Sequence, residues 1–353
     1  MDKYLFVNSS LDSGGSERVM TLIANYFSEQ DKEVHMVLLR DNKTRVYNLN
    51  SKIICKQFSY KKRRKLSILV SRFKQLRKYI RDNEIDYVIS FMWDINLFTL
   101  IACLGLHKKV IVSERADPRR GKKSLVRSFG QNFLYLLSYK IVFQTNEVLN
   151  MFPKWIRKKG VIIHNPINEN IPDYYNGERK KIIVAAGRLV EQKNFQLLIN
   201  GFKDFHNIHP EYSLAIYGDG HLKKELLSLV NEYGLLNVVT LPGYVDNLNE
   251  IMKDKCMYVS TSNFEGISNV MIEALAMGVP SICTDCPVGG AALMIENNKN
   301  GLLIPVNDKE LLVNSMCKIV EDKDFAKNIS LEALKVRDKY SISNIGEQWI
   351  SLF

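Results

Sequence analysis

Two glutamates, Glu265 and Glu273, stand eight residues apart in the stretch "SNFEGISNVMIEALAMGVPSICTD". The apolar run around Glu273 ends at Gly278, which predicts a helix over about 269–277 with Glu265 on the loop before it. Backbone N–H groups at such a helix start are unpaired and can bind phosphate oxygens. A carboxylate one turn further in can accept hydrogen bonds from a vicinal diol, as in a ribose. The spacing therefore favours a site for phosphates and hydroxyl groups.

Two cations follow another predicted strand in the stretch "AAGRLVEQKNFQLLINGF". Arg188 comes directly after the strand, and Lys193 stands five residues later at the start of a predicted helix. Two cations and a helix N-terminus on one loop make a cradle for a diphosphate. If these residues stood alone, a pair of solvated surface charges would explain them equally well.

A glycine-containing loop, "SSLDSGGSERVM", joins the first predicted strand to the first predicted helix. Gly14 and Gly15 would let the backbone approach a ligand closely, and the helix start offers N–H groups to an anion. The loop is not GxGxxG, and no acidic residue ends the second strand where a dinucleotide ribose would need one. A plain tight turn therefore explains these glycines about as well as a binding loop does.

Short apolar strands alternate twice with amphipathic helices, which is the pattern of an α/β protein with parallel sheets. The polar stretch "NPINENIPDYYNGERKK" separates the two series and predicts a linker. Parallel sheets bind ligands at the carboxyl ends of their strands, so we expect the site in the cleft between two Rossmann-like domains. The predicted strands are "YLFVNS", "VHMVLL", "YVISF", "VIVSE", "KIVFQ" and "VIIHN" in the first series, then "KIIVAAG", "SLAIYG", "VVTLPG", "CMYVST", "PSICTD" and "GLLIP".

The composition is that of an ordinary globular protein of 353 residues, 46% hydrophobic and 25% charged. Its net charge of +11 is uneven: residues 1–172 hold 31 Lys and Arg against 15 Asp and Glu, whereas residues 173–353 hold 18 against 23. The basic half suggests a partner with phosphates, such as nucleic acid, an anionic membrane or a phosphorylated substrate. The first residues lack a signal-peptide pattern and the apolar stretch 95–106 is too short to span a bilayer, so we expect a cytoplasmic location.

The six cysteines are scattered, and only Cys283 and Cys286 stand close together, in "CTDC". A zinc site would need a second pair of ligands, which the sequence does not place nearby. We interpret these two cysteines as small, semi-buried residues after a strand.

Further motifs follow in a fixed order along the chain. Together with the glycine loop, they resemble the retaining glycosyltransferases of family 4, which have the GT-B fold, and the resemblance covers essentially the whole chain. It is greatest to bacterial enzymes that build capsule, O-antigen or lipid-linked oligosaccharides. The motifs are "HNPI", "GRLVEQK", "IYGDG", "VVTLPGY", "EGISNVMIE" with its E-x7-E spacing, and "NGLLIPVND".

The resemblance implies an α/β GT-B fold, in which two Rossmann-like domains face each other across a cleft. We expect an N-terminal acceptor-binding domain at residues 1–168 and a C-terminal nucleotide-sugar-binding domain at residues 169–336. Residues 337–353 are expected to form a helix that returns to the N-terminal domain.

The resemblance also implies roles for single residues. Arg188 and Lys193, with the backbone of Gly15, would stabilise the diphosphate as it leaves, Glu273 would bind the ribose, and Glu265 would hold hydroxyl groups of the donor sugar. Ser268 or Asn269 is expected to cap the helix. The other implied donor-binding positions are Gly14, the backbone of Tyr244 and Val245 beside the base, and Gly266, Ile267, Ser268, Asn269 and Val270 near the sugar and phosphates.

Members of this family use no metal, because cations and helix N-termini neutralise the diphosphate instead. We therefore expect no cofactor and no metal ion, with a nucleotide-sugar, most simply a UDP-sugar, as substrate. The six histidines form no cluster in the sequence, and the one DxD, at residues 322–324, fits a solvated helix face. Retention of the anomeric configuration also follows from the resemblance.

The chain departs from the family where many relatives carry a His in an "SEH"-like segment. Here Arg115 follows Glu114 in "VSERADPRR". An arginine cannot accept a proton, so Arg115 could instead orient a sugar hydroxyl or bind a phosphate, or it could buttress the loop through Glu114. We count it with Glu265, Arg188 and Lys193 as a catalytic candidate. The acceptor-side candidates are Trp93, Asn96, Glu114, Arg115, Arg119 and Arg120.

A second departure lies in "CPVGGAALMIENN". Relatives often have a Glu soon after the two glycines, where this chain has Ala291, Ala292 and Leu293.

The stretch "YKKRRKLSILVSRFKQLRKYIRD" at residues 60–82 predicts a cationic amphipathic helix, because apolar residues recur in it at steps of three and four. It could attach the protein to an anionic membrane that carries a polyprenyl-diphosphate acceptor. Alternatively, the apolar stripe packs on the first domain and the cations are merely solvated. Nucleic acid is set aside as a partner, because no nucleic-acid-binding motif or aromatic stacking platform is present.

Together these features predict a retaining, metal-independent glycosyltransferase on the inner face of a bacterial membrane. It would move a hexose or N-acetylhexosamine from a UDP-sugar to a lipid-linked or polysaccharide acceptor. The alternatives are a sugar-nucleotide epimerase of the same fold and a non-catalytic partner subunit that binds sugars.

Overall fold

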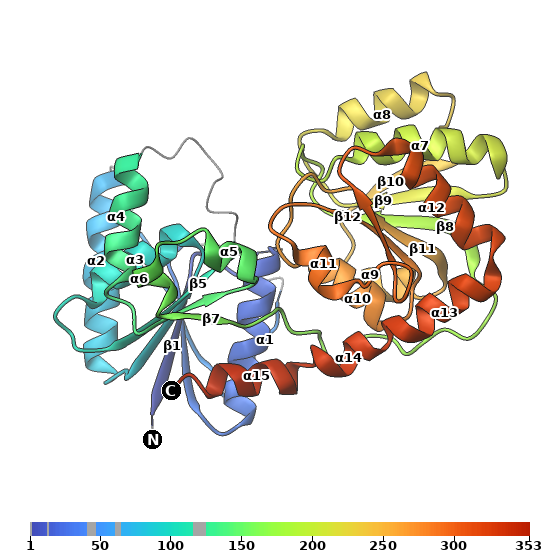
Figure 1. Cartoon of the computed structure of the whole chain (residues 1–353). Helices are drawn as coiled ribbons and strands as arrows, with labels where there is room; N and C mark the ends of the chain where they lie inside the picture. The colour runs from blue at the N-terminus through green and yellow to red at the C-terminus, as the bar shows by residue number, and fades with distance from the viewer. Residues whose placement is uncertain (1, 13, 41–46, 61–64, 116–124) are drawn as a thin grey trace. The chain divides into compact units, whose positions relative to one another are not determined.

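The computed structural model describes residues 2–12, 14–40, 47–60, 65–115 and 125–353. The chain divides into two compact units (Figure 1). Unit 1 consists of residues 1–166 and 342–353, and unit 2 consists of residues 167–341. Each unit contains one parallel sheet with helices packed against it, so the predicted α/β GT-B fold class is confirmed.

The described part of unit 1 forms a seven-stranded sheet in the order β3-β2-β1-β4-β5-β6-β7, and every pairing in it is parallel. The central strands are continuous apolar runs because helices cover the sheet on both faces. The strands are β1 Lys3–Asn8, β2 Glu33–Leu38, β3 Ile54–Gln57, β4 Tyr87–Phe91, β5 Lys109–Glu114, β6 Lys140–Phe143 and β7 Gly160–Ile162. The helices are α1 Gly15–Glu29, α2 Lys65–Asp82, α3 Trp93–Cys103, α4 Leu125–Tyr135, α5 Asn146–Asn150, α6 Lys154–Arg157 and α15 Ile342–Ile350.

Among the described residues of unit 1, β3 is the strand that the sequence analysis missed. It pairs only with β2 at the edge of the sheet, and its residues alternate between exposed and half-buried. An edge strand with so little buried surface carries no apolar run, so its local pattern does not distinguish it from a loop.

Unit 2 contains a six-stranded parallel sheet in the order β10-β9-β8-β11-β12-β13. Its core joins apolar side chains of the sheet to those of α7 and α12, with Phe202 and Phe205 fully buried among them. The strands are β8 Lys180–Ala186, β9 Ser213–Tyr217, β10 Val239–Gly243, β11 Lys255–Ser260, β12 Ser281–Asp285 and β13 Leu302–Pro305. The helices are α7 Phe195–Ile208, α8 Lys223–Glu232, α9 Leu248–Met252, α10 Asn269–Ala276, α11 Gly290–Met294, α12 Lys309–Glu321, α13 Lys323–Ala333 and α14 Lys335–Lys339.

The last helix, α15, belongs to unit 1 although it follows the whole of unit 2 in the sequence. It packs against α1, where Tyr26 donates a hydrogen bond of 2.6 Å to Glu347, and Trp349 stacks on Phe91 with ring centroids 5.5 Å apart. Gly346 allows this approach, because a Cβ there would lie 2.2 Å from the Tyr26 ring. The returning helix was predicted at residues 337–353, whereas the segment that belongs to unit 1 begins at residue 342 and residues 337–341 belong to unit 2.

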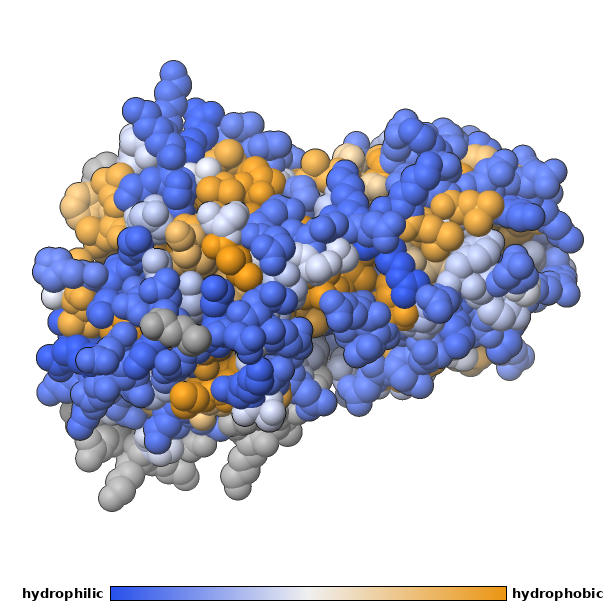
Figure 2. Space-filling view, turned by 90° about the horizontal axis from the view of Figure 1, so that it is seen from below, coloured by the Kyte–Doolittle hydropathy of each residue, from blue (hydrophilic) through white to orange (hydrophobic). Residues whose placement is uncertain are grey.

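The apolar stripe of helix α2 is buried near its end and exposed near its start. Near its end, Leu76 and Ile80 are fully buried, as expected if the stripe packs on unit 1. Near its start, Leu66, Leu69 and Val70 are exposed. Figure 2 shows one face of the molecule, on which hydrophobic side chains interrupt a largely hydrophilic surface. The first turns of α2 therefore present apolar groups to solvent.

Candidate functional site

The loops after β8 and β11 lie side by side, because these two strands are neighbours in the sheet of unit 2. Backbone bonds link them, with the N–H of Asn263 donating to the carbonyl of Gln192 at 2.8 Å. Side chains add to this, since Thr261 donates to the carbonyls of Lys193 and Asn194. The tertiary structure thus brings together the two stretches that the sequence analysis singled out, 72 residues apart.

Lys193 and Glu265 form an ion pair between these loops, with Lys193 Nζ donating to Glu265 Oε2. Only 13% of the Lys193 side chain and 22% of the Glu265 side chain are exposed. The same carboxylate accepts from Ser262 Oγ at 3.2 Å and from Gln192 Nε2 at 3.4 Å. The Lys193 side chain passes over Gly187 to reach the Glu265 carboxylate, and a Cβ at Gly187 would lie 2.8 Å from Lys193 Cε. The pair is therefore neutral, ordered and partly shielded from water.

Arg188 lies on the same loop as Lys193, but its side chain differs in exposure and in its partners. Its side chain is exposed and makes no hydrogen bond or ion pair with any described residue. The guanidinium is therefore available to an anion, whereas the ammonium of Lys193 is already occupied.

Helix α10 begins as predicted, with Ser268 as its N-cap. Ser268 Oγ accepts from the N–H of Met271 at 3.5 Å, and the helix ends at Ala276, one residue earlier than expected. Glu273, which was predicted to meet a ribose, is only 3% exposed and lies within this helix. The preceding loop is braced by α11, because a Cβ at Gly290 would lie 1.8 Å from the carbonyl oxygen of Gly266.

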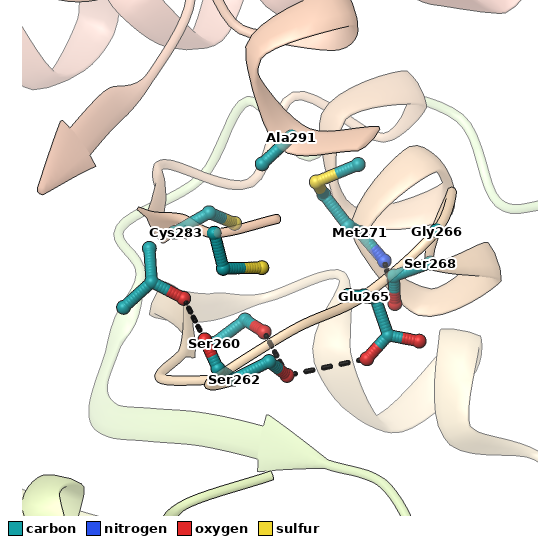
Figure 3. A pocket seen from close by; sticks show the side chains of 10 residues that line it. Ser260, Ser262, Glu265, Gly266, Ser268, Met271, Cys283 and Ala291 are labelled. Atoms are coloured by element: carbon teal, nitrogen blue, oxygen red, sulfur yellow. Dashed lines mark hydrogen bonds between the residues drawn. The ribbon is translucent and has the colours of Figure 1, made fainter. Parts of the chain in front are cut away.

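A small pocket lies between this loop, the end of β11 and the end of β12 (Figure 3). Its volume is about 10 Å³, enough for about one water molecule and too little for a sugar ring. Thr284 Oγ1 donates to the carbonyl of Ser262 at 2.6 Å beside it. The lining residues are Ser260, Ser262, Glu265, Gly266, Ser268, Met271, Cys283, Thr284, Cys286 and Ala291.

The two cysteines of "CTDC" lie in this pocket wall, and both are free and buried. Burial raises the pKa of the Cys286 thiol to about 11 and that of Cys283 further still. These sulfurs are therefore neutral groups that pack beneath Glu265.

Tyr244 and Val245 follow β10, next to the loop after β9. The N–H of Tyr244 donates to Asp219 Oδ2 at 3.1 Å, and the hydrogen bonds to Lys223 and to this N–H lower the pKa of Asp219. The sequence analysis quoted "IYGDG" but gave Asp219 no role. Gly218 in the same motif has φ +129, and a Cβ there would lie 2.0 Å from the carbonyl oxygen of Gly187. Close packing of glycines thus joins the loops after β8, β9 and β10.

In unit 1, Gly14 is the N-cap of α1 and adjoins a carboxylate of its own helix. A Cβ at Gly14 would lie 2.0 Å from Glu17 Oε2, and Ser16 Oγ donates to the same oxygen at 2.7 Å. An anion that approached the backbone of Gly14 and Gly15 would first have to displace Glu17. The sequence analysis missed Glu17, although an acidic residue in the first turn is a common partner of a helix N-terminus.

Arg115, also in unit 1, is half-buried behind the end of β5. Its Nε donates to Ser113 Oγ at 2.8 Å and its Nη1 to Asn165 Oδ1 at 2.5 Å, while its guanidinium lies 4.3 Å from the centroid of Phe91 and 5.9 Å from that of Trp349. Its Nη2 is buried without a hydrogen-bond partner among the described residues. Burial of the charge lowers the pKa of Arg115.

The interpretation of Arg115 as a buttress through Glu114 is wrong. The two side chains form no ion pair in the described structure; the Glu114 carboxylate instead accepts from Tyr135 at 2.8 Å and from Gln131 at 3.3 Å. Arg115 instead donates to Ser113 and Asn165, so the two groups face different neighbours.

The other acceptor-side candidates are placed unequally. Asn96 is fully buried, donates to the carbonyl of Ser113 and accepts from Ser90 at 2.8 Å, so its amide supports the core of unit 1. Trp93 is half-buried at the start of α3. Arg119 and Arg120 lie outside the described residues.

Comparison with known families matches both units. The family described as Glycosyltransferase Family 4 matches residues 13–170, and the family described as Glycosyl transferases group 1 matches residues 167–336.

Curated relatives align along nearly the whole chain. One is the Campylobacter jejuni N-acetylgalactosamine-N,N'-diacetylbacillosaminyl-diphospho-undecaprenol 4-alpha-N-acetylgalactosaminyltransferase, 29% identical over 95% of each chain. Another, from the same organism, is a GalNAc-alpha-(1->4)-GalNAc-alpha-(1->3)-diNAcBac-PP-undecaprenol alpha-1,4-N-acetyl-D-galactosaminyltransferase, 25% identical over 100% of this chain and 98% of the relative.

Solved structures share the fold at lower identity. Anabaena HepE in complex with UDP-glucose has a TM-score of 0.83 and 17% identity, covering 99% of both chains. TarM has a TM-score of 0.84 and 14% identity, covering 100% of this chain and 98% of TarM.

Proposed function

Because the chain is a glycosyltransferase of the GT-B fold, with a Family 4 domain followed by a group 1 domain, we propose that it is a retaining enzyme that needs no metal. It transfers a hexose or N-acetylhexosamine from a UDP-sugar to a lipid-linked or polysaccharide acceptor in the synthesis of a bacterial surface glycan. The observation that carries the proposal is the Lys193–Glu265 ion pair beside the exposed Arg188.

The diphosphate of the donor binds where positive charge is available. Arg188 is exposed and makes the first contact, because a guanidinium can bind two phosphate oxygens at once. Lys193 then turns from Glu265 toward the second phosphate, since a doubly charged diphosphate attracts it more strongly than one carboxylate does. The freed carboxylate of Glu265 accepts hydrogen bonds from hydroxyl groups of the donor sugar.

In the transfer step, the bond between the anomeric carbon and the diphosphate oxygen breaks, and its electron pair leaves with UDP. The acceptor oxygen forms the new bond on the same face of the sugar, and its proton goes to a diphosphate oxygen. Arg188 and Lys193 stabilise the charge that develops on the leaving group, which is the work a metal ion does in other transferases. Glu265 serves as a hydrogen-bond acceptor in this scheme and transfers no proton.

The names of the relatives support the choice of substrates. Two of them are named for undecaprenol-linked acceptors, and HepE was solved with UDP-glucose. At the loop proposed to face the base, Tyr244 is exposed and Val245 is half-buried. These similarities favour a UDP-sugar donor and a polyprenyl-diphosphate acceptor for this chain.

A lipid-linked acceptor requires contact with a membrane surface. Across the residues that the structure describes, no helix is both long and apolar enough to span a bilayer. We propose that the protein binds peripherally to an anionic inner leaflet through the first turns of α2, where exposed Leu66, Leu69 and Val70 adjoin a basic segment.

The test is UDP release from a panel of UDP-sugars in the presence of EDTA, with and without a bacterial membrane extract. We expect release from one donor that requires the extract and is lost in Glu265→Ala. Glu191→Gln is the matched control, because Glu191 lies on the neighbouring loop and pairs only at the surface with His221. Release that needs a divalent ion, or that survives Glu265→Ala, would overturn the proposed mechanism.

A further inference from the structure

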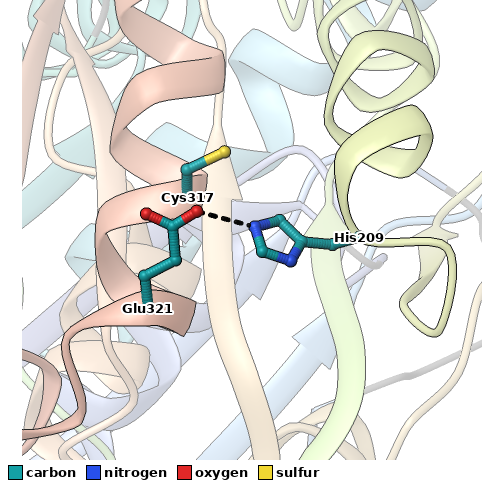
Figure 4. A group of neighbouring side chains, drawn as sticks. All are labelled: His209, Cys317 and Glu321. Carbon is teal, nitrogen blue, oxygen red and sulfur yellow. Dashed lines mark hydrogen bonds and ion pairs between the residues drawn. The ribbon is translucent and has the colours of Figure 1, made fainter.

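Three side chains with different ligand atoms meet at the ends of α7 and α12 in unit 2 (Figure 4). His209 is the C-cap of α7, and Cys317 and Glu321 stand one turn apart on one face of α12. One ligand atom from each, the imidazole nitrogen, the sulfur and a carboxylate oxygen, lies within 4.8 Å of the other two. His209 Nε2 and Glu321 Oε1 already lie 3.0 Å apart.

Rigid elements hold the three side chains in place. Helices α7 and α12 pack against each other over the core of unit 2. The backbone N–H of His209 closes α7 by donating to the carbonyl of Phe205 at 2.9 Å, and the His209 ring lies 5.1 Å from the Phe205 ring and 6.0 Å from the Tyr212 ring. Ligands fixed in this way lose little conformational entropy on binding an ion.

A simple surface ion pair does not account for the cluster. His221 and Glu191 form such a pair at 2.9 Å, but both are mostly exposed, at 62% and 74% of their side chains, and no sulfur adjoins them. His209, in contrast, is only 18% exposed, and Cys317 is a partly buried free thiol beside it. The thiol of Cys317 is the third group, and it distinguishes this cluster from the surface pair of His221 and Glu191.

We propose that His209, Cys317 and Glu321 bind a Zn²⁺ ion, with water at the fourth position. A nitrogen, a sulfur and one carboxylate oxygen are the ligands that zinc takes in tetrahedral sites, whereas Ca²⁺ and Mg²⁺ require mostly oxygen. Cobalt binds the same set of ligands and serves as a spectroscopic probe.

The zinc site is structural and lies apart from the Lys193–Glu265 pair. In a parallel α/β unit, each helix runs back from the carboxyl ends of the strands to their amino ends. The ends of α7 and α12 therefore lie at the edge of the sheet opposite the loops after β8 and β11. The ion would fasten α7 to α12 and stabilise unit 2, without taking part in transfer.

The experiment titrates Co²⁺ and then Zn²⁺ into the metal-free full-length protein. We expect a near-ultraviolet charge-transfer band from cobalt bound to the Cys317 thiolate, saturating at one ion per chain and displaced by Zn²⁺. At a Zn²⁺ concentration a hundredfold above Kd, Tm should rise by about 5–10 °C. Cys317→Ser should abolish the band and the rise in Tm, and His209→Gln and Glu321→Gln should each weaken Zn²⁺ binding at least tenfold.

Two matched control variants and a check that the Cys317→Ser variant folds complete the test. Cys55→Ser removes another partly buried free thiol, and His221→Ala removes the histidine of the surface pair, so both should bind Co²⁺ as the wild type does. The Cys317→Ser substitution is nearly isosteric, and a circular dichroism spectrum checks that this variant folds. Absence of the thiolate band in the wild type, or an undiminished band in Cys317→Ser, overturns the proposal. UDP release is unaffected by either result, so the failure of this inference is separate from a failure of the proposed function.

Discussion

Each unit holds a half-buried cation near the carboxyl end of its sheet, Lys193 in unit 2 and Arg115 in unit 1, and the two are held in opposite ways. Lys193 in unit 2 is paired with the carboxylate of Glu265 from the neighbouring loop. Arg115 in unit 1 meets no carboxylate among the described residues and is held by a hydroxyl, an amide oxygen and two aromatic faces. A neutral pair between two loops can rearrange when an anion arrives, whereas a cation fixed by three elements cannot move without disturbing them.

From this difference we infer that Lys193 binds the substrate and that Arg115 supports the fold. Arg115 joins the end of β5 to Asn165, just before the chain leaves unit 1, and to Trp349 on the returning helix α15. Desolvation of a charge without an opposite charge beside it is costly, so we infer that the contribution of Arg115 lies in the segments that it connects. Lys193 makes no such link beyond its own site.

The largest effect is expected at Glu265, the acceptor of the ion pair. Glu265→Ala should lower kcat by roughly 10²–10³-fold, because the contact to the sugar hydroxyls is lost at the reacting centre. UDP affinity should stay equal or increase, since Lys193 is no longer held by the carboxylate. Isothermal titration with UDP and a kinetic assay check both parts, and a loss of UDP binding would contradict the assignment.

Substitutions of Lys193 and of Arg188 should differ more in their effect on stability than in their effect on activity. Each change, Lys193→Met or Arg188→Ala, should lower kcat/KM by roughly 10–100-fold, because each removes one cation from the diphosphate. Only Lys193→Met should also lower the free energy of unfolding, by about 1–3 kcal/mol, since it leaves the half-buried Glu265 unpaired. Urea unfolding of the two variants measures the difference, and equal losses of stability would break the comparison.

Arg115 should be replaceable by an apolar side chain of similar length. Arg115→Met should change the free energy of unfolding by no more than about 1.5 kcal/mol, because Met fills the space between the two rings and a buried charge is removed. Asn165, which would lose its hydrogen bond from Arg115, keeps another partner, because Gln144 donates to it at 2.7 Å. Arg115→Ala, in contrast, should cost about 2–5 kcal/mol through the cavity it creates.

Activity decides whether Arg115 also touches a substrate. We expect Arg115→Met to retain kcat/KM within about tenfold, as for a positioning residue whose contacts are internal. A much larger fall in kcat with an unchanged Tm would instead show that the buried Nη2 binds a phosphate or a sugar hydroxyl.

The smallest effect is expected at Asp219, which holds the N–H of Tyr244 beside the predicted position of the base. Asp219→Asn keeps a hydrogen-bond acceptor and should leave KM for the donor nearly unchanged, whereas Asp219→Ala should raise it a few-fold with kcat unaffected. Donor saturation curves for the two variants measure this, and a fall in kcat in either variant would place Asp219 closer to the chemistry.

Local patterns allowed most of the fold to be predicted. Each strand of unit 2 coincides with a predicted apolar run to within a residue or two, because a strand buried on both faces requires such a run. The sequence left Ser268 and Asn269 open as the N-cap of α10, and the structure has Ser268 there. Strand β3 was missed because pairing with β2, and not its own sequence, makes it a strand.

The sequence by itself determined which residue types stand at the ends of the strands, including Arg188, Lys193 and Glu265, since strand and helix periods are local properties of the chain. Only the tertiary structure decided what those residues contact. The partners of Lys193, Arg115 and His209 lie 72, 50 and 112 residues away in the chain. Such contacts depend on which strands become neighbours in the sheet and which helices pack together, and no local period specifies that.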